Sequence, residues 1–463
     1  AATAWNLAMI RADLATSALG LDGTGVVVAN LDTGVDWQHP ALLTRYRGYR
    51  ERGPAVHRGN WHVSTNEPYL YPGDGSGHGT HTMGTIVGDD GAGNRVGVAP
   101  GARWIAVKLF TNDGLTYESW IHDAFEWIMA PEGDPALAPD VVNNSWGSDN
   151  GANDIFRPDL NALRAAGILP VFAAGNNGPG AGSVGSPGSY PEALTVGAVA
   201  VDFAIGSFSG RGPSPWDEIK PEVVAPGVQV LSAFPGGGWA LGTGTSMAAP
   251  HVTGLAALLR GAFPQATVNE LEGLIQTTAR PLGEDVPNND SGWGLIDAYA
   301  AGLRVTVHGE LVGRALRADG AGISYAQLTA TPHDPAGSVI VTTADASGAF
   351  TVALRPGLYD VTGQAFGFAP TASGGIVIVA GERRQITLTL PTLPAGSVFG
   401  RVTEATTAAP LSATITVDAT PARTQTDPNT GLYSLALPEG VWTLRFAADA
   451  HRIVRQAVTV TAA

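Results

Sequence analysis

The most informative stretch of this chain is Gly242-Thr243-Gly244-Thr245-Ser246-Met247-Ala248-Ala249-Pro250-His251-Val252. It places the hydroxyl of Ser246 between small residues and an apolar run with helical spacing that includes Leu255. Glycines let the backbone approach other groups closely, and the start of a helix offers free N–H groups and a positive dipole end. The pattern predicts Ser246 at a helix N-terminus, either as a cap or as an exposed nucleophile. A nucleophile also needs a base and an orienting acid.

Length and composition limit the possible classes of protein. A chain of 463 residues is too long for one ordinary core, so two or three domains are expected. The formal net charge of −15 disfavours a nucleic-acid partner, and no apolar run is long enough to predict a membrane span. The absence of cysteine excludes disulfides, thiol catalysis and thiolate metal sites.

The first residues, Ala1-Ala2-Thr3, show neither the charged segment nor the apolar run of a signal peptide. Two interpretations follow. The protein is cytosolic, or this is a processed form from which an export signal has been removed.

A buried strand is predicted at residues 26–31, and it delivers Asp32 at its C-terminal end. Ligand sites of open α/β sheets lie outside the carboxyl ends of the strands, so Asp32 occupies a functional position. The alternative is that Asp32 only forms a turn with Thr33 and Gly34.

A second glycine-rich stretch, residues 75–88, predicts a helix whose first turn carries His78. His81 follows at i+3, on the same side of that helix. No glutamate stands between the two histidines as zinc proteases require, so we do not expect them to bind a metal.

Predicted strands and helices alternate through the first two thirds of the chain. This order predicts a parallel α/β sheet covered by helices on both faces, in a domain spanning residues 1–303. The further strands are expected at 104–109, 140–147, 168–174 and 193–199, and the helices at 118–130, 158–167, 246–262 and 268–279.

The sequence changes character after about residue 303, where short runs of alternating apolar and polar residues replace the helical pattern. Gly348 corresponds to Gly431 and Gly357 to Gly440, an offset of 83 residues in both cases. Such a repeat indicates an internal duplication. We therefore predict two small all-β sandwich domains, at 304–392 and 393–463.

Asp32, His78 and Ser246 supply the acid, base and nucleophile of a serine hydrolase, because serine is a poor nucleophile until an oriented imidazole accepts its proton. Four blocks occur in the expected order: Leu31-Asp32-Thr33-Gly34, Gly77-His78-Gly79-Thr80-His81, Ala173-Ala174-Gly175-Asn176 and Gly244-Thr245-Ser246-Met247-Ala248. These blocks resemble those of the subtilisin-like serine endopeptidases, and most closely the bacillopeptidase F-like branch.

The resemblance implies a subtilisin-like fold and a role for each matching residue. Ser246 would attack the scissile carbonyl and form an acyl-enzyme, with His78 as general base and then general acid. Asp32 would orient His78, while the Asn176 amide and the Ser246 N–H would stabilise the oxyanion.

The same resemblance implies two segments that bind an extended peptide by backbone pairing, and a primary pocket beside them. Trp146 replaces a smaller apolar residue, and Asn177 stands where some relatives carry an acid. We therefore expect an apolar or aromatic preference at the primary pocket, with little attraction for Lys or Arg. The expected binding residues are Gly114, Leu115, Thr116, Ser145, Trp146, Gly147, Ala174, Gly175 and Asn177.

The resemblance implies no cofactor for catalysis and allows calcium as a structural stabiliser. Relatives with a strong calcium site have an acid where this chain has Ala41, and carbonyls near Gly188, Tyr190 and Ala193 match a weaker cation site. We assign no metal ligand. Protein or peptide substrates, a propeptide precursor and secretion are also implied.

The C-terminal repeats resemble carboxypeptidase regulatory-like or other prealbumin-like β-modules, and their role stays open. They would stabilise the catalytic domain, recruit a large substrate or act as a spacer. The rival hypothesis is a catalytically silent scaffold whose β-repeats bind a partner. An esterase is disfavoured because Ser246 does not lie in a Gly-x-Ser-x-Gly motif.

Overall fold

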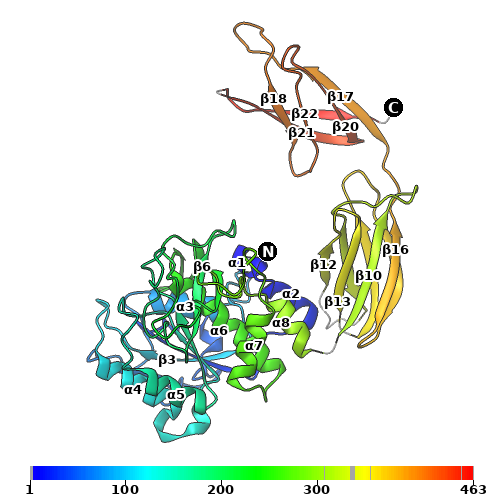
Figure 1. Ribbon diagram of the computed structural model, residues 1–463. Helices are drawn as coiled ribbons and strands as arrows, with labels where there is room; N and C mark the ends of the chain where they lie inside the picture. The colour runs from blue at the N-terminus through cyan, green and yellow to red at the C-terminus, as the bar shows by residue number, and fades with distance from the viewer. Residues whose placement is uncertain (1–3, 307, 334–338, 355, 450, 462–463) are drawn as a thin grey trace. The chain divides into compact units, whose positions relative to one another are not determined.

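The computed structural model describes residues 4–306, 308–333, 339–354, 356–449 and 451–461 (Figure 1). The chain forms two compact units, Ala1–Thr306 and Val307–Ala463. The first unit ends three residues beyond the boundary expected from sequence because a terminal helix, α8 (Ala298–Val305), packs against α2 (Ala12–Leu19). The two units are described separately below.

A seven-stranded sheet with the order β2-β3-β1-β4-β5-β6-β7 forms the centre of the first unit, and all its strand pairs are parallel. This confirms the predicted α/β class. The two outer strands were not predicted, because each is too short to show a clear period. The strands are β1 (Val27–Asp32), β2 (Trp61–Val63), β3 (Arg103–Lys108), β4 (Val141–Asn144), β5 (Leu169–Ala173), β6 (Leu194–Val199) and β7 (Val223–Pro226).

Helices cover both faces of this sheet, and a β-hairpin, β8 (Val230–Phe234) with β9 (Gly238–Gly242), leads into the longest of them, α6. Besides α2 and α8, the α-helices are α1 (Trp5–Met9), α3 (His78–Val87), α4 (Glu118–Met129), α5 (Arg157–Ala165), α6 (Thr245–Ala262) and α7 (Val268–Thr277).

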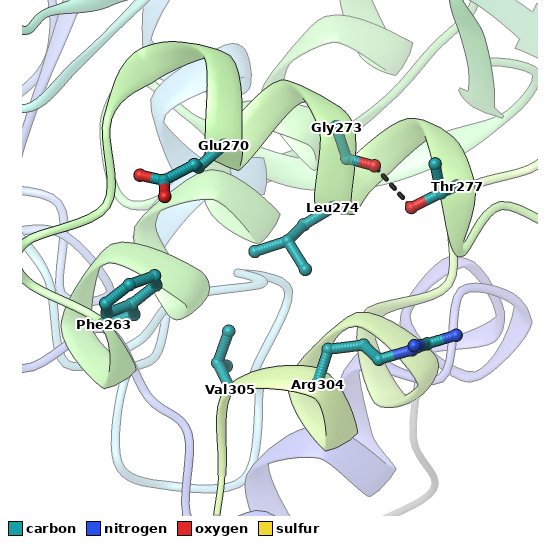
Figure 2. Close-up of a pocket in the computed structure, with 7 residues that line it drawn as sticks. All are labelled: Phe263, Glu270, Gly273, Leu274, Thr277, Arg304 and Val305. Atoms are coloured by element: carbon teal, nitrogen blue, oxygen red, sulfur yellow. Dashed lines mark hydrogen bonds between the residues drawn. The ribbon is translucent and has the colours of Figure 1, made fainter.

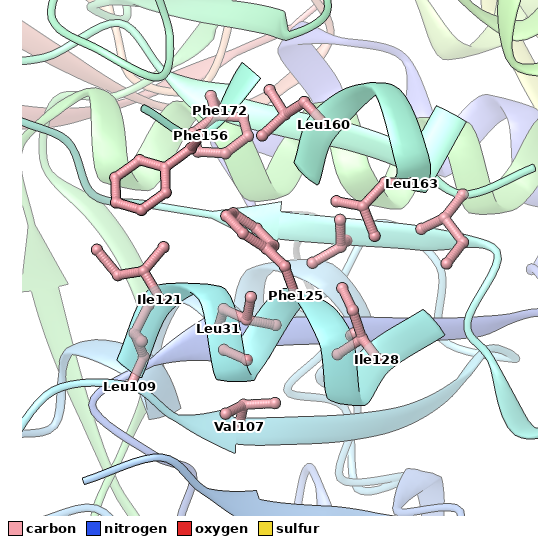
Figure 3. Packing of buried hydrophobic residues seen from close by; sticks show 14 of the residues in the cluster. Leu31, Val107, Leu109, Ile121, Phe125, Ile128, Phe156, Leu160, Leu163 and Phe172 are labelled. Carbon is pink, nitrogen blue, oxygen red and sulfur yellow. The ribbon is translucent and has the colours of Figure 1, made fainter. Parts of the chain in front are cut away.

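The face of the sheet under α4 and α5 is a continuous apolar core (Figure 3). Leu31 of β1 and Phe172 of β5 point into it, as do Phe125 of α4 and Leu163 of α5. Consecutive strand residues point to opposite faces. The neighbour of Leu31, Asn30, therefore faces α3 and α6 on the other side.

The carboxyl ends of three neighbouring strands bring the predicted blocks together. Asp32 is the last residue of β1, Ser145 directly follows β4, and Ala174 directly follows β5. Parallel strands end at the same edge of a sheet, and this edge is where α/β proteins bind their ligands. The topology therefore gathers residues that lie far apart in the sequence.

The second unit contains two similar β-modules, which confirms that all-β domains follow the α/β domain. In the first, β10 pairs with β13, and β11 with β12 and β14; in the second, β17 pairs with β20, and β18 with β19 and β21. The duplicated glycines lie at equivalent places: Gly348 and Gly431 directly precede β13 and β20, whereas Gly357 and Gly440 begin β14 and β21.

The strands of the first β-module are β10 (Gly309–Leu316), β11 (Gln327–Pro332), β12 (Ile340–Thr343), β13 (Ala349–Leu354), β14 (Gly357–Gln364), β15 (Thr371–Ile378) and β16 (Arg383–Thr389). Those of the second are β17 (Ala395–Arg401), β18 (Ala413–Val417), β19 (Arg423–Gln425), β20 (Leu432–Pro438), β21 (Gly440–Ala448) and β22 (Val454–Val460). Within the described residues, no helix is both long enough and apolar enough to span a membrane.

Candidate active site

Asp32 and His78 form a direct hydrogen-bonded pair. Nδ1 of His78 lies 2.8 Å from Oδ1 and 3.0 Å from Oδ2 of Asp32, so Nδ1–H donates to the carboxylate. Asp32 is 2% exposed and the His78 side chain 35% exposed. The buried acid fixes the ring from one side, which leaves Nε2 of His78 as the nitrogen that can accept a proton.

His78 is the first residue of α3, where the backbone must pass close to the turn after β1. A Cβ atom on Gly79 would lie 2.1 Å from the Gly34 carbonyl oxygen and 3.0 Å from Cβ of Asp32. Only glycine fits this contact. The Gly-His-Gly sequence thus lets the imidazole approach its acid.

A second carboxylate, that of Asp74, holds the start of α3 in place. It accepts hydrogen bonds from the backbone N–H groups of Gly77 and Thr80, both at 2.8 Å, and from the Thr80 hydroxyl at 2.6 Å. It also accepts the hydroxyl of Thr33, at 2.9 Å. Sequence reasoning missed Asp74, although an acid four residues before a helix-starting histidine is a visible signal.

The charges around His78 change its proton affinity. Burial lowers the pKa of His78, but the charge and hydrogen bond of Asp32 and the charge of Asp74 outweigh this effect and raise the pKa above its ordinary value. The imidazolium form that follows proton abstraction is therefore stabilised by two carboxylates.

Ser246 lies in the first turn of α6 and is joined to Ser145 by two hydrogen bonds. The Ser145 hydroxyl donates to the Ser246 carbonyl at 2.8 Å, and the Ser246 hydroxyl donates to the Ser145 carbonyl at 2.9 Å. Among the described residues no hydrogen bond joins the Ser246 hydroxyl to His78. Catalytic hydrogen bonds are often formed only when substrate is bound, so this geometry is compatible with a nucleophile.

The side chain of Asn176 is oriented by the residue before Ser246. Its oxygen accepts the Thr245 backbone N–H at 2.9 Å and the Thr245 hydroxyl at 3.1 Å. Because the oxygen is used in this way, the NH₂ group is the end left for a ligand.

Both predicted substrate-binding segments contribute to one cavity of about 220 Å³. Thr116 comes from one segment, and Trp146 and Gly147 come from the other. Phe110 and Phe156 add aromatic surface to its lining. The structure thus brings residues of the two segments to one shared cavity.

The other predicted binding residues lie beside this cavity or at the ends of strands. Leu115 is 60% exposed in the loop between β3 and α4, next to Gly114, and its backbone pairs with Thr111. The backbone groups of Ala174 and Gly175 are partly used within the protein, because Gly185 and Gly210 donate to their carbonyls. Their roles in substrate binding stay predictions.

Asn177, which stands where some relatives carry an acid, itself contacts an acid in this structure. Its amide donates to the carboxylate of Asp149 at 2.5 Å. Sequence reasoning did not find this acid because Asp149 comes from the separate loop that follows Gly147.

Two groups considered from the sequence as possible metal ligands, His81 and the Ala193 carbonyl, have other partners in the structure. Nε2 of His81 donates to the carbonyls of Val230 and Ala240, and no cluster of three or more His, Asp or Glu side chains suited to a metal occurs among the described residues. At the predicted weak cation site, the Lys220 ammonium donates to the Ala193 carbonyl at 2.8 Å and pairs with Glu222. The Ala193 carbonyl therefore already accepts a hydrogen bond from an ammonium group.

A separate cavity of about 570 Å³ lies where the end of α6 meets α7 and α8 (Figure 2). Two of its polar side chains serve the helices themselves, since Thr277 donates to the Gly273 carbonyl and Glu270 accepts from Thr267, and the third is Arg304. The rest of the lining is largely apolar, and none of the predicted catalytic residues belongs to it. We assign it no part in the chemistry.

Comparison with known proteins shows the family to which this chain belongs. The model of the subtilase family matches residues 23–294, more than half of the chain. The chain belongs to the subtilase family. The model of the carboxypeptidase regulatory-like domain matches residues 310–391, which is the first β-module.

Individual relatives are similar over somewhat less than two thirds of the chain, 61% to 65% of its length. Bacillopeptidase F of Bacillus subtilis is 47% identical over 325 residues, covering 65% of this chain but only 22% of that protein. Subtilisin of Bacillus pumilus is 35% identical over 284 residues, covering 61% of this chain and 92% of the relative. Subtilisin Savinase of Lederbergia lenta is 35% identical over 297 residues, with coverage of 64% and 97%.

Proposed function

We propose that this subtilase is a secreted serine endopeptidase that cleaves peptide bonds through an acyl-enzyme formed on Ser246. The observation that carries the proposal is the hydrogen bond between Asp32 and His78, in a domain that also presents Ser246 in the first turn of α6. Family membership and the names of the relatives support a peptidase.

The proposed reaction follows from the partners of each group. His78 takes the Ser246 proton on Nε2, since Nδ1 is held by Asp32. The Ser246 oxygen bonds to the substrate carbonyl carbon, and the Asn176 amide with the Ser246 N–H stabilises the oxyanion. Imidazolium then protonates the leaving amine, and water repeats the sequence to release the acid.

We further propose an apolar or aromatic preference at the primary pocket, a propeptide precursor and secretion. The preference is supported by the aromatic side chains beside Trp146 and by Asn177. The carboxylate of Asp149 argues against this preference, because a carboxylate attracts basic side chains. The hydrogen bond that Asp149 accepts from the Asn177 amide offsets part of that attraction.

Digestion of a mixture of proteins, with the products identified by mass spectrometry, tests the activity and maps the pocket together. We expect cleavage after Phe and Leu by the wild type and no cleavage by Ser246→Ala. Matched peptides with Phe, Leu, Lys or Arg before the scissile bond measure the preference directly, with Asp149→Asn as the control for the acid. Faster cleavage after Lys would contradict the proposed preference.

Asn176→Ala tests the oxyanion role separately. We expect kcat to fall by about 10²–10³-fold with KM little changed, a magnitude known from subtilisin itself rather than derived from this structure. An unchanged kcat would show that the amide does not stabilise the oxyanion.

A further inference from the structure

Two fully buried amides lie beneath the predicted triad, between the sheet and the helices α3 and α6. Asn30 belongs to β1, two residues before Asp32, and Asn143 belongs to the neighbouring strand β4, two residues before Ser145. Both side chains are 0% exposed. A buried amide is costly unless its hydrogen bonds are formed, so their partners matter.

Asn30 links β1 to the helix that carries His78. Its NH₂ group donates to the Gly79 carbonyl at 3.1 Å and to the Thr82 hydroxyl at 3.0 Å, both on α3. The Thr82 hydroxyl also lies 3.4 Å from Oδ2 of Asp32. The amide therefore holds α3 against the strand that ends in the acid.

Asn143 continues the same network toward the helix that carries Ser246. Its NH₂ group donates to Oδ1 of Asn30 at 2.9 Å and to the Ser145 hydroxyl at 3.0 Å. Its oxygen accepts the hydroxyl of Thr253, on α6, at 3.1 Å. The Ser145 hydroxyl in turn donates to the carbonyl of Ser246.

The two side chains have all their N–H groups and both oxygens paired, and together they connect β1, α3, β4 and α6. Apolar packing is not directional, whereas hydrogen bonds have a narrow range of lengths and angles. A fully satisfied buried network therefore fixes the register of the elements that it joins. The opposite face of the same sheet, under α4 and α5, is held by apolar side chains.

We propose that Asn30 and Asn143 are positioning residues, whose shared hydrogen-bond network sets His78 and Ser246 in register for proton transfer. The inference rests on the proposed peptidase function. Asn30 and Asn143 would not touch the reacting atoms themselves; they would act on the reaction by positioning His78 and Ser246.

Asn30→Leu tests the proposal, with Asn144→Leu as its matched control. Leucine has the same branching as asparagine but no hydrogen bonds. Asn144 is equally buried in the same sheet, and its amide donates only to the backbone carbonyls of Val142 and Val171. Asn30→Leu loses stability, because it leaves the buried polar partners of Asn30 unpaired. Asn144→Leu loses less, because the amide that it removes has a buried oxygen with no hydrogen-bond partner among the described residues.

We expect only Asn30→Leu to lower kcat, by up to about 100-fold, because a small misplacement of reacting groups has an effect of that size. KM should change less than kcat, since Asn30 itself contacts α3 and Asn143 and neither substrate-binding segment. Assays well below the melting temperature separate this effect from unfolding. Equal kcat values for the two variants would overturn the proposal.

A second pair of variants covers the case in which Asn30→Leu does not fold. Thr82→Val removes one hydroxyl of the network, whereas Thr85→Val removes a buried hydroxyl of the same helix that donates only to the His81 carbonyl. We expect a lower kcat for Thr82→Val alone, and the same kcat for both would again overturn the proposal. A wild type without peptidase activity would instead refute the proposed function.

Discussion

The geometry of single residues explains why one imidazole in this chain is suited to be a base. His78 donates to a buried acid on one side and begins a helix whose first turn is tied down by Asp74. His81, one turn further along the same helix, donates to two carbonyls. Burial lowers the pKa of His81, whereas carboxylates raise that of His78.

Replacing Asp74 by asparagine should move the pH dependence of catalysis. The charge of Asp74 raises the pKa of His78, and only the neutral imidazole accepts the serine proton. Asp74→Asn therefore lowers this pKa, and the acid limb of the kcat/KM profile shifts to lower pH. Asp90→Asn is the control, since Asp90 also accepts backbone N–H groups but lies in an exposed loop. Identical acid limbs for Asp74→Asn and the wild type would contradict this account.

Site residues could be predicted from the sequence where a short block of neighbouring residues marks them. Asp32, His78, Asn176 and Ser246 each lie in a short glycine-rich block, so their place at strand ends and helix starts could be predicted. The hydrogen bond of the Asn177 amide to Asp149, by contrast, depends on how separate loops meet. No spacing in the sequence predicts such contacts.

At the scale of elements, α6 carries a buried histidine, His251, one turn after Met247. Nδ1 of His251 lies 2.8 Å from the Met247 carbonyl, so Nδ1–H donates, and Nε2 accepts the Asn6 amide at 2.8 Å. Burial lowers the pKa of His251 to about 4. The folded protein therefore holds this ring neutral, whereas the unfolded chain protonates it near its ordinary value.

This histidine should make the fold sensitive to acid. Between the unfolded pKa, near 6.5, and about 4, the unfolded state binds the extra proton, so stability falls as pH falls. Over this whole range, the free energy of unfolding falls by about 3 kcal/mol. Urea unfolding of the wild type and His251→Gln at pH 7 and pH 4.5 measures it, because glutamine does not titrate. A stability difference between the two proteins that is the same at both pH values would contradict the prediction.

The loop before β6 is held by a buried ammonium group, that of Lys220, which is 0% exposed. Lys220→Met leaves the carboxylate of Glu222 without its cationic partner, and we expect a loss of about 3–5 kcal/mol in the free energy of unfolding. Lys220→Met/Glu222→Gln should regain part of it, since no unpaired charge remains. Urea unfolding tests both, and a double variant no more stable than Lys220→Met would argue against this role.

At the scale of the whole molecule, the fold class and the change of class after the first unit could be predicted from periodicity. Strands β2 and β7 could not, because three or four residues are too few to show a period. Helix α8 was missed for a related reason: its eight residues contain several alanines and no clear apolar stripe. Its packing against α2 sets the end of the first unit.

The contacts described for the triad all lie within residues 1–306. We therefore expect a protein truncated after Thr306 to hydrolyse a small peptide with the kcat/KM of the full chain. The same pair of proteins, assayed on an insoluble protein substrate, shows whether the β-modules help to recruit large substrates. Loss of activity on the small peptide, with the truncated protein still folded, would show that the β-modules contribute to the site itself.

The central claim, that Ser246 is an activated nucleophile, is tested most directly by labelling with a serine-directed phosphonate. We expect one phosphonyl group per wild-type molecule, located by mass spectrometry on the peptide that contains Ser246. Labelling should be lost in Ser246→Ala and should slow at acidic pH as His78 becomes protonated. An unlabelled wild type, or equal labelling of Ser246→Ala, would contradict the claim.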